Sequence, residues 1–136
     1  MSHNEALGQL LMARALAARE NAYAPYSAFP VGAALQTASG EIFDGCNIEN
    51  CSYGLTNCAE RTAIFKAVSA GHRKVKALAV AGNTDDPIAP CGACRQVIAE
   101  FAERDTLVWL TNLKGDVQKT TLGDLLPGAF GAADFT

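Results

Sequence analysis

Pro90-Cys91-Gly92-Ala93-Cys94 and, earlier in the chain, Asn57-Cys58-Ala59-Glu60 are the most informative motifs of this sequence. Cys91 and Cys94 are three residues apart, so on a helix both sulfurs lie on one face. Each stretch falls at a predicted helix start, where free N–H groups and the helix dipole favour a thiolate over a thiol. Two helix N-termini that met at one point would therefore offer three thiolates.

Three ligands, rather than four, predict a catalytic zinc site. Structural zinc sites usually close with four protein ligands, whereas catalytic sites keep one position for water. Glu60 follows Cys58 by two residues, so its carboxylate could reach a metal-bound water without binding the metal. Zinc lowers the pKa of such a water, and a nearby Glu can take the proton and return it to a substrate. We expect Cys58, Cys91 and Cys94 to bind Zn²⁺ and Glu60 to move protons.

The charge of this site needs compensation. Three thiolates carry −3 against the +2 of zinc, which would weaken the metal as a Lewis acid. Arg61 and Arg95 each stand next to one of the two motifs. Both arginines are therefore predicted to support the ligands from the outer shell.

Other readings of the cysteines remain open. A Cys-x-x-Cys pair can be a redox site, but such a site does not require Cys58 and Glu60. A zinc ribbon normally has two paired motifs, and here there is one. A structural zinc module would need a fourth ligand, most plainly Cys46 or Cys51, although we favour small buried residues at both positions. Neither histidine, at the chain start or at a helix end, stands in a good ligand context.

Composition bounds the class of protein. The chain has 136 residues, 49% hydrophobic and 18% charged, which suits one globular domain over residues 1–136. Its net charge of −3 argues against nucleic acid or an anionic membrane as a partner. The N-terminus lacks a basic region followed by an apolar run, and no run approaches about 20 apolar residues. We expect a cytoplasmic protein, in which five cysteines are not a disulfide framework.

Hydrophobic periodicity and turn residues predict the element order α-β-β-α-β-α-β-β, typical of an α/β sheet that is partly parallel and covered by helices. Asn4 is the expected N-cap of the first helix, and Gly71 is expected to follow the end of the second. The predicted elements are a helix over 5–21, strands over 31–37 and 41–47, a helix over 58–70, a strand over 75–81, a helix over 91–103, strands over 106–111 and 117–121, and one helical turn over 122–126.

Nearly the whole chain resembles the small zinc-dependent cytidine deaminases of nucleoside salvage. Besides the two cysteine motifs, the resemblance is carried by the blocks at 26–34, 45–50 and 125–130. It implies a three-layer α/β/α sandwich with a mixed five-stranded sheet. It also implies hydrolytic deamination of cytidine and deoxycytidine to uridine and deoxyuridine, in pyrimidine salvage.

The resemblance assigns further roles residue by residue. Asn47 and Glu49 would hydrogen-bond the ribose hydroxyls, and Phe29 would pack on the pyrimidine ring. The backbone at Ala59 would help to read the base, and Arg61 would steady the cysteine ligands. Independently, residues i and i+2 of a strand point to one face, so Asn47 and Glu49 could together receive a sugar diol.

In this family, residues at the positions of Tyr53 and Phe130 contact the ligand from neighbouring subunits. A homotetramer with shared active sites is therefore implied. Two related functions share the chemistry: deamination of cytosine in a polynucleotide and deamination of a cytosine-containing antibiotic. The first needs a basic groove with stacking aromatics, which the acidic balance disfavours, and the Asn47 and Glu49 pair favours a nucleoside over the second.

Overall fold

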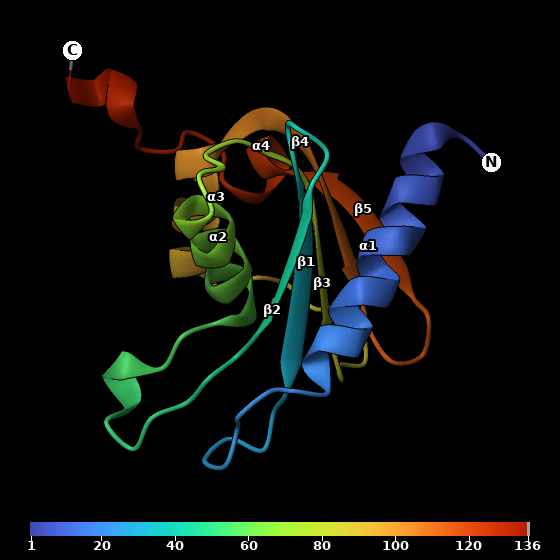
Figure 1. Cartoon of the computed structure of the whole chain (residues 1–136), viewed down its shortest axis with the longest axis vertical. Helices are drawn as coiled ribbons and strands as arrows, with labels where there is room; N and C mark the ends of the chain where they lie inside the picture. Colours follow the sequence, from blue (N-terminus) through green and yellow to red (C-terminus); the bar gives the residue numbers. More distant parts are fainter. Residues whose placement is uncertain (136) are drawn as a thin grey trace.

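The computed structural model describes residues 1–135 and contains one five-stranded sheet (Figure 1). The strands stand in the order β2-β1-β3-β4-β5, and only β3 and β4 run parallel. The predicted order of helices and strands and the mixed five-stranded sheet are confirmed. The elements are α1 (His3–Arg19), β1 (Val31–Thr37), β2 (Ile42–Cys46), η1 (Tyr53–Leu55), α2 (Ala59–Ser69), β3 (Val75–Gly82), α3 (Gly92–Phe101), β4 (Ala102–Thr111), β5 (Val117–Thr121), α4 (Leu122–Leu125) and η2 (Ala132–Phe135).

The sheet is the middle of three layers, as expected. Helix α1 covers one face, and α2 and α3 cover the other (Figure 1). Successive residues of a strand point to opposite faces, so in β1 Ala34 joins the core under α1 while Leu35 joins the core under α2 and α3. Trp109 of β4 closes the α1 side. Because both faces are buried, the central strands are apolar without alternation.

Helix α2 lies unusually close to strand β2. A Cβ placed on Gly45 would lie 2.5 Å from the amide nitrogen of Ala63 and 2.9 Å from the carbonyl oxygen of Ala59. Only glycine leaves room for this approach. The close packing fixes the first turn of α2, and hence the position of Cys58, against the sheet.

The ends of two helices differ from the prediction. Helix α1 is capped by Ser2, whose Oγ accepts from the Glu5 N–H at 3.1 Å, so the prediction of Asn4 was wrong. Helix α3 ends at Phe101 rather than Glu103, because Ala102 pairs with Val75 and already belongs to β4. The charged residues that follow Ala102 resemble a helix surface in sequence, yet they belong to β4, between the pairings of Ala102 with Val75 and of Leu107 with Ala77.

The end of α2 follows the prediction. Gly71 takes φ +97°, and its N–H donates to the Val68 carbonyl at 2.9 Å. The His72 N–H reaches back to Ala67 at 2.9 Å. This pair of bonds is the Schellman motif, which glycine accommodates without strain.

Two basic side chains connect α1 and α2 to the β2 carboxylate of Asp44. Arg14 lies 3.1 Å and Lys66 3.2 Å from its oxygens. Partial burial opposes ionisation of Asp44, but the two cations outweigh it and lower its pKa. Within residues 1–135, no helix is long and apolar enough to cross a bilayer.

Candidate active site

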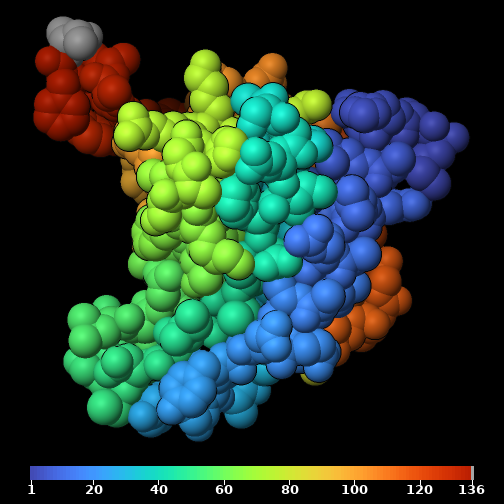
Figure 2. All heavy atoms as spheres, viewed as in Figure 1, coloured from blue at the N-terminus to red at the C-terminus, as the bar shows by residue number. Residues whose placement is uncertain are grey.

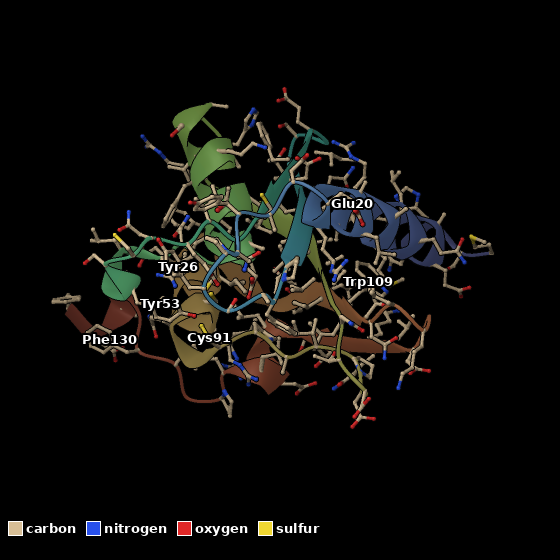
Figure 3. The ribbon with its side chains drawn as sticks, turned by 90° about the horizontal axis from the view of Figure 1, so that it is seen from below. Glu20, Tyr26, Tyr53, Cys91, Trp109 and Phe130 are labelled. Carbon is tan, nitrogen blue, oxygen red and sulfur yellow. The ribbon has the colours of Figure 1, made fainter. Side chains whose placement is uncertain are left out.

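The two cysteine motifs meet in space at the start of two helices. Cys58 is the N-cap of α2, Cys91 is the N-cap of α3, and Cys94 lies in the first turn of α3. Their three Sγ atoms all lie within 4.8 Å of one another. In Figure 3 Cys91 lies on the side of the molecule that carries Tyr53, whereas Trp109 lies on the other side, toward α1. The two helix N-termini therefore lie together, as predicted.

The sulfur cluster suits a zinc ion. Ligands about 2.3 Å from a tetrahedral zinc lie about 3.8 Å from one another, and the cysteines are close enough to take that arrangement. Helix N-termini favour thiolates here, and the Cys94 N–H points at the Cys91 sulfur at 3.4 Å. Among residues 1–135, neither Cys46 nor Cys51 belongs to the cluster. The expectation that both are buried was wrong, since Cys46 is only partly buried and Cys51 is exposed. The donor set is therefore three sulfurs, which leaves one position open.

Arg61 and Arg95 differ in what they touch. The Arg61 Nη2 donates to the Cys58 sulfur at 3.0 Å. A hydrogen bond from Cys94, helped by Arg61, lowers the pKa of the Cys58 thiol to about 5. Arg95 instead donates to the carbonyls of Pro90 at 2.9 Å and Leu125 at 2.7 Å. It thereby braces the residue before Cys91 against α4, and its compensation of thiolate charge stays a prediction.

Glu60 lies beside the cluster without joining it. Its side chain is in the first turn of α2, is only 4% exposed and lines the same cavity as Cys58 and Cys91. Burial raises the pKa of this carboxyl above its ordinary value, because the charged form loses its hydration. A buried carboxyl with a raised pKa is suited to accept and return a proton near neutral pH.

A cavity of about 240 Å³ opens above the cluster. Of the predicted substrate-binding residues, it is lined by Phe29, Asn47, Glu49, Tyr53 and Ala59. The sequence interpretation missed five further lining residues: Ser27, Val31, Thr56, Ile88 and Ala89. Ser27 and Val31 lie inside the block at 26–34, and Thr56 and Ala89 directly precede the two cysteine motifs, so proximity in sequence could have indicated these four. Their orientation toward the cavity depends on the loops.

Three loop segments are tied together to form the wall of the cavity. Ile48 bridges to Tyr23 on one side and to Asn57 on the other. Figure 2 shows the segments 22–30 and 47–57 lying against one another at one end of the molecule. Ile48 is 46% exposed while its neighbours Asn47 and Glu49 are buried and line the cavity. The strand-like alternation predicted for this pair therefore holds beyond the end of β2.

Both polar side chains of this wall hold the loop that carries Phe29. The Asn47 amide donates to the Phe29 carbonyl and accepts from the Val31 N–H, each at 2.9 Å. The Glu49 Oε1 accepts from the N–H groups of Tyr26 at 2.9 Å and Ser27 at 3.0 Å. Each side chain keeps hydrogen-bonding capacity for a ligand.

Phe130 lies apart from the cavity of its own chain. It stacks edge-on against Phe135 with ring centroids 5.5 Å apart and is 60% exposed. It follows α4, in a segment that extends away from the sheet (Figure 1). Tyr53, on η1, lines the cavity yet is 59% exposed. Figure 3 shows Tyr53, Phe130 and Cys91 on the same side of the molecule.

Several known proteins are similar to this chain in sequence and in fold. The family model described as the cytidine and deoxycytidylate deaminase zinc-binding region matches residues 6–110. A cytidine deaminase of Sporosarcina psychrophila is 61% identical over 93% of each chain. A blasticidin-S deaminase of Bacillus cereus is 37% identical over 71% of this chain and 74% of its own length. The crystal structure of cytidine deaminase from Burkholderia pseudomallei superposes with a TM-score of 0.88 at 57% identity, covering 96% of this chain and 100% of that one.

These similarities span both cysteine motifs, the sheet and the helices that position them. The three-sulfur cluster lies within the part of the chain that matches this zinc-binding region. The chain belongs to the cytidine and deoxycytidylate deaminase family.

Proposed function

We propose that the protein hydrolyses the exocyclic amine of cytidine and deoxycytidine, giving uridine or deoxyuridine and ammonia. The observation that carries this proposal is the buried Glu60 carboxyl beside three convergent cysteine sulfurs, in a cavity that also holds Asn47 and Glu49. A cavity of about 240 Å³ lies just under the range of about 300–1,000 Å³ typical of small-ligand sites. It suits one nucleoside.

Cys58, Cys91 and Cys94 would hold Zn²⁺. When bound, the metal would lower the pKa of a water molecule, so that this water could lose a proton and act as the nucleophile toward C4 of the base. Glu60 would accept the proton that this water gives up and deliver it to N3 of the ring. It would then assist protonation of the departing amine. The C4–N bond breaks, a C4–O bond forms, and ammonia leaves. Arg61 would stabilise the Cys58 thiolate throughout.

The remaining side chains would orient the nucleoside. Phe29 would pack against the pyrimidine ring, and the backbone at Ala59 would help to read its polar edge. The Asn47 side chain has one N–H and one lone pair that are not used within residues 1–135. The Glu49 carboxylate can only accept hydrogen bonds. Together these groups suit the hydroxyls of a sugar, which both donate and accept. A homotetramer in which neighbouring subunits complete each cavity is part of the proposal, which rests on the family resemblance. Phe130, which is exposed and lies outside the cavity of its own chain, would contact a neighbouring one.

Pyrimidine salvage is the proposed role, and the cytoplasm the proposed location. Thiolate ligands need a reducing compartment to stay free of disulfides, and all five cysteines are free. Deamination of an antibiotic is less supported, because identity to the blasticidin-S deaminase is 37% against 61% for the cytidine deaminase.

Ultraviolet monitoring of purified protein with cytidine tests the proposal. We expect the absorbance to change with time and the change to stop after zinc is removed by a chelator. Blasticidin S and a cytosine-containing single-stranded oligonucleotide, assayed in parallel, should react far more slowly. Rapid turnover of either one without turnover of cytidine would refute the nucleoside assignment.

A further inference from the structure

The loop that carries Phe29 is organised around one hydroxyl group, that of Ser27. Its Oγ donates to the Glu49 Oε2 and accepts from the Phe29 N–H at 3.1 Å. The Ser27 N–H donates to the other Glu49 oxygen at 3.0 Å. One residue therefore joins the carboxylate proposed to bind the sugar to the backbone of the residue proposed to pack on the base.

We propose that Ser27 is a positioning residue that fixes Glu49 for recognition of the sugar hydroxyls. This inference rests on the proposed function, because it assigns Glu49 to the sugar. Ser27 lines the cavity but acts through Glu49.

The hydrogen-bond count of Glu49 supports the inference. A carboxylate has about four lone-pair sites, and three are filled by Tyr26 N–H, Ser27 N–H and the Ser27 hydroxyl. Among residues 1–135, Oε2 accepts a hydrogen bond from Ser27 alone, so the free lone-pair site lies on that oxygen. Without the hydroxyl, Oε2 would lose the partner that fixes its direction. The same hydroxyl is the largest cause of the lowered pKa of Glu49, which agrees with a hydrogen bond donated to the ionised carboxylate.

The backbone of the loop is held in an uncommon conformation around this hydroxyl. Ala28 takes φ +55°, the left-handed region that a residue with a Cβ seldom adopts. Such a conformation persists where the surroundings determine it. Here the Ala28 N–H donates to the Ala24 carbonyl at 3.0 Å, and the flanking residues are joined through the Ser27 hydroxyl. The loop is thus built to present Ser27 to Glu49.

The two hydrogen bonds of the Ser27 hydroxyl, with the Phe29 N–H and with Glu49, differ in how readily water could replace them. The Phe29 N–H lies in an exposed bond and can turn to water. Glu49 is 5% exposed, so its oxygen has less access to water as a replacement. Loss of the hydroxyl should therefore act mainly on sugar recognition and only slightly on the base.

The test compares Ser27→Ala with the wild type on cytidine and on 2′,3′-dideoxycytidine, which lacks both ring hydroxyls. We expect the KM for cytidine to rise about tenfold, the scale of one hydrogen bond to a charged group, with kcat changed less than about twofold. The KM for the dideoxynucleoside should change less than about twofold. Ser27→Thr, which keeps a hydroxyl, should restore most of the affinity for cytidine.

The matched control is Ser39→Ala, at the β1–β2 turn. Ser39 also makes two side-chain hydrogen bonds, to Thr37 and His72, but lies at the opposite end of β1, about 20 Å away. Both substrates should be unaffected in this variant. Circular dichroism checks folding, and if Ser27→Ala is poorly folded, Ser27→Cys gives the same comparison with a similar volume and a weak donor.

An unchanged KM for cytidine, or an equal rise for both substrates, would overturn the assignment of Ser27. The first would mean that Glu49 needs no support, and the second that Ser27 serves the fold or the base. Failure of the proposed function has a different signature, because the wild type itself would then not turn over cytidine.

Discussion

Replacement of Glu60 by glutamine removes one proton acceptor and leaves the volume of the side chain almost unchanged. Glu60 lies outside the group formed by the three cysteine sulfurs, so Glu60→Gln should retain zinc at the level of the wild type. Its position in the first turn of α2 is also kept, because the amide fills the same buried space. What disappears is the group that can take a proton from water and pass it on.

The size of the loss follows from the burial of Glu60. At 4% exposure, bulk water cannot readily substitute for the carboxylate as a base. One positioned acid–base group contributes about 10²- to 10⁴-fold, and Glu60 is assigned both to proton removal and to proton delivery. We therefore expect kcat to fall by at least about 10⁴-fold, equivalent to about 5.4 kcal/mol in the activation free energy. KM should change little, because sugar and base contacts remain.

The assay combines turnover of cytidine, followed by ultraviolet absorbance, with zinc content measured by mass spectrometry of the dialysed protein. Glu100→Gln, on the exposed face of α3, is the matched control and should behave as the wild type. Turnover of Glu60→Gln within about tenfold of the wild type would refute the proton-transfer role. Loss of zinc from the variant would instead identify Glu60 as a ligand and contradict the three-sulfur site.

Three further outcomes are expected. Cys46→Ser and Cys51→Ser should keep both zinc and turnover, since neither sulfur belongs to the cluster; loss of zinc from either would support a closed, four-ligand site. Gly45→Ala should lower the free energy of unfolding in urea by about 2 kcal/mol, the scale of overpacking, whereas Gly131→Ala, with open space around it, should change it little. Asp44→Asn should cost at most about 1 kcal/mol at neutral pH, because its ion pairs are partly exposed. The pKa of Asp44 is lowered in the folded protein, so its contribution to the free energy of unfolding is present above its ordinary pKa of 3.8 and is lost as the pH falls further. A difference in the free energy of unfolding between Asp44→Asn and the wild type that grew in acid would contradict this.

Local rules accounted for most of the elements. The strand Val31–Thr37 and the strand Val117–Thr121 have the predicted bounds, since their turns and hydrophobic patterns are strong. The start of β4 was missed because it depends on the pairing of Ala102 with Val75, a long-range contact that no local pattern encodes. The N-cap of α1 was predicted at Asn4, but the side chain of Ser2 makes the capping bond to the Glu5 N–H.

The wall of the cavity shows the limit of sequence reasoning most clearly. Asn47 and Glu49 were predicted to share a face from their spacing, and they do. The bond between Ser27 and Glu49 joins residues 22 apart in the chain, and no local pattern encodes it. Phe130 was assigned to the ligand through the family resemblance alone, and it lies outside the cavity of its own chain.

Residue spacing alone predicted a donor set of three cysteines at two helix starts, with a carboxylate two residues from one of them. This prediction needs only local geometry, because the turn of a helix places i and i+3 on one face and its N-terminus favours a thiolate. Folding of the whole chain was needed to bring the two helix starts together, to bury Glu60 beside them and to join Ser27 to Glu49. These depend on long-range packing, such as the close approach of α2 to Gly45, which brings distant segments together at distances that no local spacing fixes.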